Sequence, residues 1–300
     1  MSRPTPAIAA FLVACLGVAM YSVMDVVMKG LVLGIGVYSA VAWRNLAGAV
    51  IAGTIWGLSR PTMPSRAALR LHLWRGVIVT FMSLLFFYSI AVLPIAEAIA
   101  LSFIAPLIAL YLAAILLGET IGRAAILSSV VGLVGVAVIL AGRLSGDYDE
   151  SALWGVAAVL ISAVLFAYNL ILARRQALIA KPLEIGFFQT LTVLTMLALA
   201  APWLLDMPRE GDWVAIVGAG VLAVISLIAM GWAYARAEAQ LLIPVEYTAF
   251  VWAAVLGWLA FDEAVTWTTL AGTVLIVAGC ILAARAKPPI AEPVVESAVA

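Results

Sequence analysis

Long apolar runs alternate with short polar breaks along the whole chain, and this pattern predicts a bundle of membrane-spanning helices. A helix needs about 20 apolar residues to cross the hydrocarbon core of a bilayer. The connections between the runs are short, which leaves no room for a soluble catalytic domain. The expected fold is therefore an all-α integral membrane protein with ten transmembrane helices. The predicted spans are 7–28, 36–57, 71–92, 95–117, 122–141, 152–173, 184–204, 213–234, 240–261 and 267–285.

The pattern repeats itself halfway along the chain. Glu119 and Glu263 each close a long apolar run, and the same shift, 263 − 119 = 144, superposes Gly135 on Gly279. Five spans in each half is an odd number, so the second half must enter the membrane from the opposite side. Inverted halves around a midplane site are typical of secondary transporters. The expected units are residues 1–146 (five helices), residues 147–287 (five helices) and a disordered tail at 288–300.

Composition agrees with this picture and excludes several classes of protein. Hydrophobic residues make up 66% of the chain and charged residues 11%, with a mean hydropathy of +1.19. A soluble domain has about 45–50% apolar and about 25% charged residues. The net charge is zero and no basic stripe is present, so a nucleic-acid partner is not expected. Asp147 and Asp149 form a close acidic pair in a loop, without a histidine, and no metal or cofactor is expected.

Lysine and arginine residues predict the orientation. If the N-terminus is cytoplasmic, twelve of them fall on the cytoplasmic side, and only Lys29, Arg143 and Arg209 fall outside. Cytoplasmic loops carry an excess of positive residues. We therefore expect a multi-pass protein of the bacterial inner membrane with both termini in the cytoplasm.

Specific motifs connect the chain to a known family. The first copy contains the stretch Ala98 to Pro106, then Leu117-Gly118-Glu119, then a glycine helix that ends at Gly142. The second copy has Phe250 in place of Pro106 and recovers at Asp262-Glu263. These features resemble the drug/metabolite transporter superfamily, and within it the ten-helix proteins with two EamA repeats. The resemblance covers residues 7–286.

The general sequence style is most similar to the bacterial amino acid exporters of this superfamily, including the aromatic amino acid group. The resemblance implies export of small organic metabolites by alternating access through a central cavity. Uptake of S-adenosylmethionine or of a vitamin such as riboflavin is the alternative, and a membrane-embedded enzyme is favoured less. The implied partners are the lipid bilayer and a small-molecule substrate, and a monomer is the simplest oligomeric state.

Ionisable residues inside the spans are few, and such residues are functional candidates. Asp25 and Lys29 are four residues apart, so they share a helix face and can pair. We expect an outer gate of ion pairs, although a static packing bridge is an open alternative. The candidate outer gate is Asp25, Lys29, Arg44 and Glu97, and the inner gate is Asn169, Gln189, Arg236 and Glu246. Pro106 and Pro244 are expected to kink their helices.

A central cavity is implied by the resemblance, on helices 1, 3, 4, 6, 8 and 9. Apolar, aromatic and hydroxyl side chains there suit a zwitterion with an apolar side chain, although ordinary packing is an open alternative for each. His72 is expected at the inner surface as a solvated helix-end residue. The candidate cavity residues are Met24, Met82, Tyr88, Ser102, Phe166, Tyr168, Trp232 and Tyr247.

Overall fold

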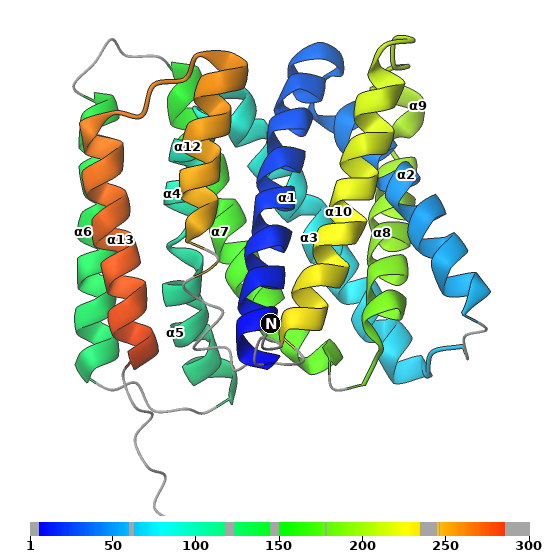
Figure 1. The fold of residues 1–300 in the computed structure, drawn as a ribbon, viewed down its shortest axis with the longest axis horizontal. Coiled ribbons are helices and arrows are strands. Elements are labelled where there is room, and N and C mark those ends of the chain that lie inside the picture. The colour runs from blue at the N-terminus through cyan, green and yellow to red at the C-terminus, as the bar shows by residue number, and fades with distance from the viewer. Residues whose placement is uncertain are drawn as a thin grey trace, which may run out of the picture.

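The protein is a bundle of helices that run side by side (Figure 1). The computed structural model describes residues 6–59, 63–117, 123–144, 150–177, 179–234, 245 and 247–285, and every regular element in them is a helix. Several sequence-predicted features lie outside the described residues. These are Glu119, Arg236, Pro244, Glu246 and the tail at 288–300.

The first half contains five spans, one of which is broken. The helices are α1 (Pro6–Ile35), α2 (Val37–Leu58), α3 (Arg66–Val92), α4 (Ile95–Ser102), α5 (Ala105–Leu117) and α6 (Arg123–Leu144). Only Gly36 separates α1 from α2, and its φ of 79° lies in the left-handed region that glycine adopts without strain. The tight reversal between the first two spans therefore depends on this glycine.

The second half repeats this order. Its helices are α7 (Glu150–Ala177), α8 (Pro182–Ala198), the short α9 (Ala201–Leu204), α10 (Asp212–Tyr234), α12 (Thr248–Phe261) and α13 (Trp267–Arg285). By length and composition, four helices in the described part of the chain are apolar enough to cross a membrane. They contain the stretches Ala9–Ile35, Arg66–Val92, Glu150–Ala173 and Asp212–Met230, and five further apolar helices are shorter.

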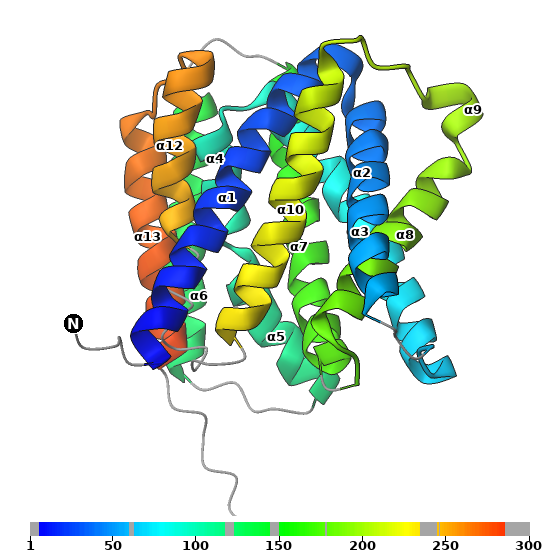
Figure 2. The same ribbon diagram turned by 45° about the vertical axis from the view of Figure 1, so that its right-hand side comes forward.

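The helices of the first half pack mainly against helices of the second half. The main pairs are α6 with α13 and α2 with α8 at the two edges of the bundle (Figure 1), and α4 with α12. In the middle, α1 packs on α10 and α3 on α7, which exchanges the first and third helices of the two halves (Figure 2). The core therefore lies between the halves, as expected for two inverted copies.

We name the two ends of the bundle after the orientation expected from the charge distribution. The inner end is where α1 begins and α13 ends, and the outer end is where α1 ends and α4 begins (Figure 1).

The predicted span at 95–117 consists of two helices, separated at residues 103 and 104 just before Pro106, where a kink was expected. Helix α4 ends at Ser102, and α5 begins at Ala105. Pro106 is the second residue of α5, where its missing N–H is not required by the helix. The proline therefore begins a new helix, whereas a continuous helix would have placed it in the interior.

Two glycines let α6 and α13 approach closely. A methyl group added at Gly135 would lie 2.6 Å from the Gly272 carbonyl oxygen, and one added at Gly272 would lie 2.5 Å from the Gly135 carbonyl oxygen. Ile139 and Ile276, both almost fully buried, pack beside them. Small residues at helix crossings are the usual means of close packing in membranes.

Candidate functional site

A buried ion pair closes the outer end of the bundle. Lys29 on α1 forms an ion pair with Glu263, which lies in the connection between α12 and α13. The Lys29 Nζ atom also donates to the Leu93 carbonyl oxygen at 2.7 Å. Lys29 is only 5% exposed, and breaking such a pair would leave a buried charge without compensation. This contact ties the first half of the chain to the second.

Glu263 has a second role at the start of α4. Its Oε2 atom accepts a hydrogen bond from the Ile95 backbone N–H at 2.8 Å. Pro94 is the N-cap residue of α4 and makes no side-chain cap. A carboxylate at a helix N-terminus satisfies free N–H groups and interacts favourably with the helix dipole. Glu263 therefore supplies the cap that the sequence of α4 lacks.

The backbone at the end of α12 directs Glu263 to this position. Asp262 has a φ of 53°, which makes it the non-glycine residue with positive φ among the described residues. A left-handed residue after a helix reverses the chain and satisfies the last carbonyl groups, and the Asp262 N–H donates to the Trp258 carbonyl oxygen at 3.1 Å. The chain then crosses over the start of α4.

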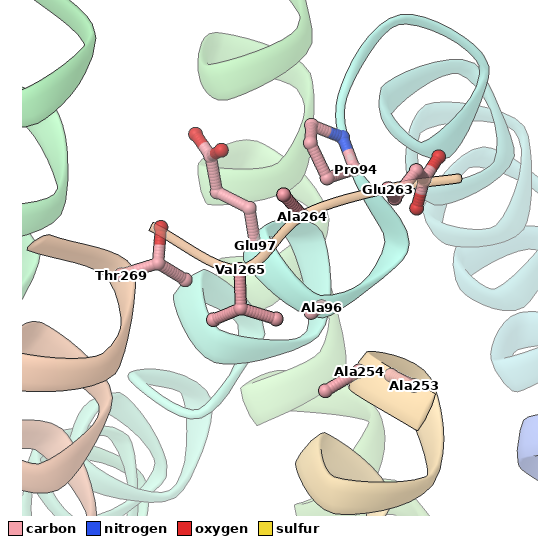
Figure 3. A pocket seen from close by; sticks show the side chains of 9 residues that line it. All are labelled: Pro94, Ala96, Glu97, Ala253, Ala254, Glu263, Ala264, Val265 and Thr269. Atoms are coloured by element: carbon pink, nitrogen blue, oxygen red, sulfur yellow. The ribbon is translucent and has the colours of Figure 1, made fainter. Parts of the chain in front are cut away.

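A small pocket lies beneath this crossing (Figure 3). Glu97, in the first turn of α4, lines it and is 3% exposed. Figure 3 shows the loop that carries Glu263, Ala264 and Val265 passing over α4. The pocket is lined by Pro94, Ala96, Glu97, Ala253, Ala254, Glu263, Ala264, Val265 and Thr269. It is small and shallow, so it belongs to the closure of the outer end.

The expected pairing of Asp25 with Lys29 is wrong, because Lys29 turns to Glu263 instead. Asp25 interacts electrostatically with Arg44 on α2. The Arg44 guanidinium lies 3.3 Å from the Met24 sulfur and 5.3 Å from the centre of the Phe87 ring. The four residues predicted as one outer cluster therefore form two groups. Lys29 and Glu97 lie at the outer end, and Asp25 and Arg44 lie deeper in the bundle.

A second polar cluster closes the inner end. His72 on α3 is fully buried, with Nε2 3.0 Å from Glu184 Oε1 and Nδ1 hydrogen-bonded to Gln176. The Arg75 Nε group donates to Asn169 Oδ1 at 2.8 Å, and its Nη1 group donates to Gln176. Here α3 of the first half is joined to α7 and α8 of the second half. We call these five residues the inner cluster.

The inner cluster corrects one expectation from the sequence. His72 is not solvated, because it turns into the bundle, as does Arg75. Gln176 and Glu184 were not expected to participate. One signal was available: His72 and Arg75 are three residues apart, on one face of a predicted helix. That face also carries Gly76, where the backbone approaches Thr192 of α8.

Of the predicted inner gate, the structure places Asn169 in the inner cluster. Gln189 on α8 is not part of it, and its buried side-chain oxygen has no hydrogen-bond partner in the described structure. Nothing connects Gln189 to the residues around Arg75.

Five of the eight predicted cavity residues face the interior. Met24 belongs to the main core, and Met82 and Phe166 pack against it. Tyr247 packs edge-on against Phe103 with ring centres 5.2 Å apart. Ser102 donates its hydroxyl to the Ala98 carbonyl oxygen at 2.8 Å, one turn earlier in the same helix.

The other predicted cavity residues lie nearer the surface. Tyr88 is 37% exposed and follows Trp74 and Phe81 on one stripe of α3. The Tyr168 hydroxyl accepts a hydrogen bond from the Trp74 indole at 3.2 Å, on an exposed face. Trp232 on α10 is 36% exposed. Aromatic residues were thus expected in the cavity at positions that the helix packing turns outward.

Comparison with known proteins places the chain in a family. The model of the EamA-like transporter family matches residues 8–141 and 153–285. The pseudopaline exporter CntI of Pseudomonas aeruginosa is 27% identical over 278 residues, which cover 92% of this chain and 96% of that protein. An S-adenosylmethionine uptake transporter of Rickettsia bellii is 25% identical over 208 residues and covers 69% of each chain.

The fold is also found in a solved structure. A protein of known crystal structure superposes with a TM-score of 0.61 at 22% identity, over 91% of this chain and 96% of that one. The apolar helices, the two matched repeats and this likeness agree with one another. The chain belongs to the EamA-like transporter family of the drug/metabolite transporter superfamily, and it is a multi-pass membrane transporter of small molecules.

Proposed function

We propose that the protein exports amino acids or amino-acid-like metabolites, including aromatic ones, by alternating access. It works in the bacterial inner membrane with both termini in the cytoplasm, and it catalyses no reaction. One observation carries this proposal: the polar contacts at each end of the bundle join one half of the chain to the other. Lys29 pairs with Glu263 at the outer end, and His72 pairs with Glu184 at the inner end.

Alternating access needs one closure on each side of the substrate, and each closure must be able to break. Contacts between halves meet this need, because a rocking motion of one half against the other separates them. Contacts within one half would not respond to such a motion. The structure has both closures formed, with apolar residues such as Met24, Met82 and Phe166 between them.

Two further observations support export of an amino-acid-like solute. The relative that matches almost the whole length of the chain is named an exporter. The interior between the closures combines sulfur and aromatic side chains with isolated charges, which suits an apolar zwitterion. A phosphate-rich substrate would instead need several converging cationic side chains.

Uptake is the second candidate function. The relative from Rickettsia bellii is named an S-adenosylmethionine uptake transporter, although it covers less of the chain. Uptake of S-adenosylmethionine or of a vitamin such as riboflavin uses the same architecture, because a carrier runs in either direction along its gradient. Direction must therefore be measured in cells.

The experiment compares bacteria that express the chain with matched bacteria that carry an empty vector. Cells are loaded with labelled L-phenylalanine, L-methionine or S-adenosylmethionine, and the loss of label is followed after dilution. We expect faster loss of the amino acids from expressing cells, and faster counterflow in proteoliposomes than in protein-free liposomes. Accumulation of external S-adenosylmethionine or riboflavin, without amino acid efflux, would favour uptake and reject the export proposal.

A further inference from the structure

Two opposite charges lie near each other inside the bundle without a direct contact. Arg44 and Asp25 interact electrostatically, but among the described residues the direct contacts between basic and acidic side chains are Lys29 with Glu263 and His72 with Glu184. The Arg44 guanidinium contacts the Met24 sulfur and the Phe87 ring, and it also interacts electrostatically with Tyr21 on α1. A thioether is a weak acceptor, whereas a guanidinium has five N–H donors. The Met24 sulfur and the Phe87 ring therefore do not satisfy all the N–H donors of Arg44.

The guanidinium faces the interior of the bundle. Met24 and Phe87, which it contacts, are 4% and 3% exposed and belong to the main core. Arg44 and Asp25 lie beside this core and keep a fraction of their own surface exposed. Charged groups at such depth in a membrane protein are costly and mark substrate or ion pathways. A pure packing role would be better served by a closed ion pair.

Arg75, the other arginine inside the bundle, differs from Arg44 in this respect. Its N–H groups are directed to Asn169 and Gln176, which hold it within the inner cluster. Arg44 has no such amide partners among the described residues. This difference selects Arg44 as the group that is free to meet an anion.

We propose that Arg44 and Asp25 bind the zwitterionic head of an α-amino acid, an inference that rests on the proposed function. The Arg44 guanidinium receives the carboxylate, since its planar fork matches two carboxylate oxygens. The Asp25 carboxylate accepts hydrogen bonds from the ammonium group. The Phe87 ring and the Met24 thioether border the site and favour a substrate with an apolar side chain.

The test uses three probes of similar shape: L-phenylalanine, phenethylamine, which lacks the carboxylate, and 3-phenylpropionate, which lacks the ammonium group. Their affinities for the purified full-length protein in detergent are measured by equilibrium dialysis and competition. We expect L-phenylalanine to bind the wild type at least about tenfold more tightly than either analogue.

Two substitutions should distinguish the carboxylate-binding part of the site from the ammonium-binding part. Arg44→Gln should remove the preference for L-phenylalanine over phenethylamine, and Asp25→Asn should remove the preference over 3-phenylpropionate. Arg70→Gln, at an exposed position of α3, is the control and should leave both ratios unchanged. Circular dichroism and size-exclusion chromatography establish that each variant is folded.

Absence of L-phenylalanine binding to the wild type, or equal binding of all three probes, would overturn the proposal. This result comes from the wild type alone and does not depend on the folding of any variant. Wild-type ratios in both folded variants would also overturn it. Efflux of L-phenylalanine with unchanged ratios would leave the proposed function standing and reject the site. Selective binding without any flux would support the site and reject export.

Discussion

The Lys29 side chain on the first helix and the Glu263 side chain near the last helix meet in one buried ion pair across 234 positions of sequence. Glu263 simultaneously accepts the Ile95 N–H at 2.8 Å. A single carboxylate thus links α1, the start of α4 and the connection that leads into α13. The side-chain contacts of Glu263 at the outer end therefore all depend on the position of the second half.

A double-mutant cycle tests this ion pair. Glu263→Gln keeps an acceptor for the Ile95 N–H but leaves Lys29 as an uncompensated buried charge, at a cost of about 3–5 kcal/mol. Lys29→Met combined with Glu263→Gln should be less destabilising than the sum of the two single changes. The measurement is thermal unfolding in detergent. Asp25→Asn with Lys29→Met serves as the comparison and should be additive, because these two residues do not pair.

The glycine crossing of α6 and α13 should not tolerate a side chain. Gly135→Ala places a methyl group 2.6 Å from a backbone oxygen of Gly272, which cannot move without separating the helices. We expect a loss of about 1–3 kcal/mol in unfolding free energy. Gly218→Ala on α10 is the matched control, because no atom lies within 4 Å of the added methyl group. Equal stability of the two variants would show that the crossing is looser than described.

Removing Gln176 should weaken the inner cluster more than its size suggests. This side chain is fully buried and bridges His72 and Arg75, so Gln176→Leu takes an acceptor from a charged donor. Hydrogen bonds to charged groups contribute about 1.5–3 kcal/mol. Gln176→Glu restores an acceptor for Arg75 and is the paired variant. Flux in proteoliposomes and the unfolding temperature should fall in the leucine variant and recover partly in the glutamate variant.

The orientation can be tested with two exposed methionines at opposite ends of the bundle. Met63 precedes α3 at the inner end and is 81% exposed, and Met207 lies between α9 and α10 and is 71% exposed. Each is replaced by cysteine in a variant that lacks Cys15 and Cys280. A membrane-impermeant maleimide should label Met207→Cys in intact cells and Met63→Cys only after lysis. The reverse pattern would invert the proposed topology.

The hydroxyl of Tyr168 should not affect substrate choice. Because it bonds to the Trp74 indole on an exposed face, Tyr168→Phe is expected to leave the competition profile of a panel of amino acids unchanged. Met82→Ala, at a position packed against the main core, should shift the profile toward bulkier amino acids. If Tyr168→Phe alters the competition profile and Met82→Ala does not, the substrate site lies on the other side of α3.

The fold could be predicted from the sequence because it follows from a pattern of apolar runs that repeats along the chain. Apolar length determines the number of spans, and an odd number of spans per repeat inverts the second half. The close glycines of α6 and α13 could also be anticipated from composition. The break between α4 and α5 was harder to place, because Pro106 is compatible with a kink inside one helix or with the start of a new one.

The site could be predicted only as a set of candidates, because partner choice is three-dimensional. Asp25 and Lys29 satisfy the spacing rule for a helix pair, yet Lys29 finds a better partner in Glu263, which also caps a helix. Hydropathy likewise does not show which face of a span packs against its neighbours, so Tyr88 and Tyr168 were expected inside the bundle. His72 was interpreted as a surface residue because polar residues at helix ends are usually solvated.

The packing of first-half helices against second-half helices has a consequence for biosynthesis. After the first five spans have left the ribosome, the surfaces that α1, α3 and α6 present to α10, α7 and α13 have nothing to cover them. The early product must wait in the bilayer, or in the insertion machinery, until the later spans arrive. A protein cut in the polar segment between α6 and α7 should therefore assemble when both fragments are made together, whereas either fragment made alone is a substrate for proteolytic quality control.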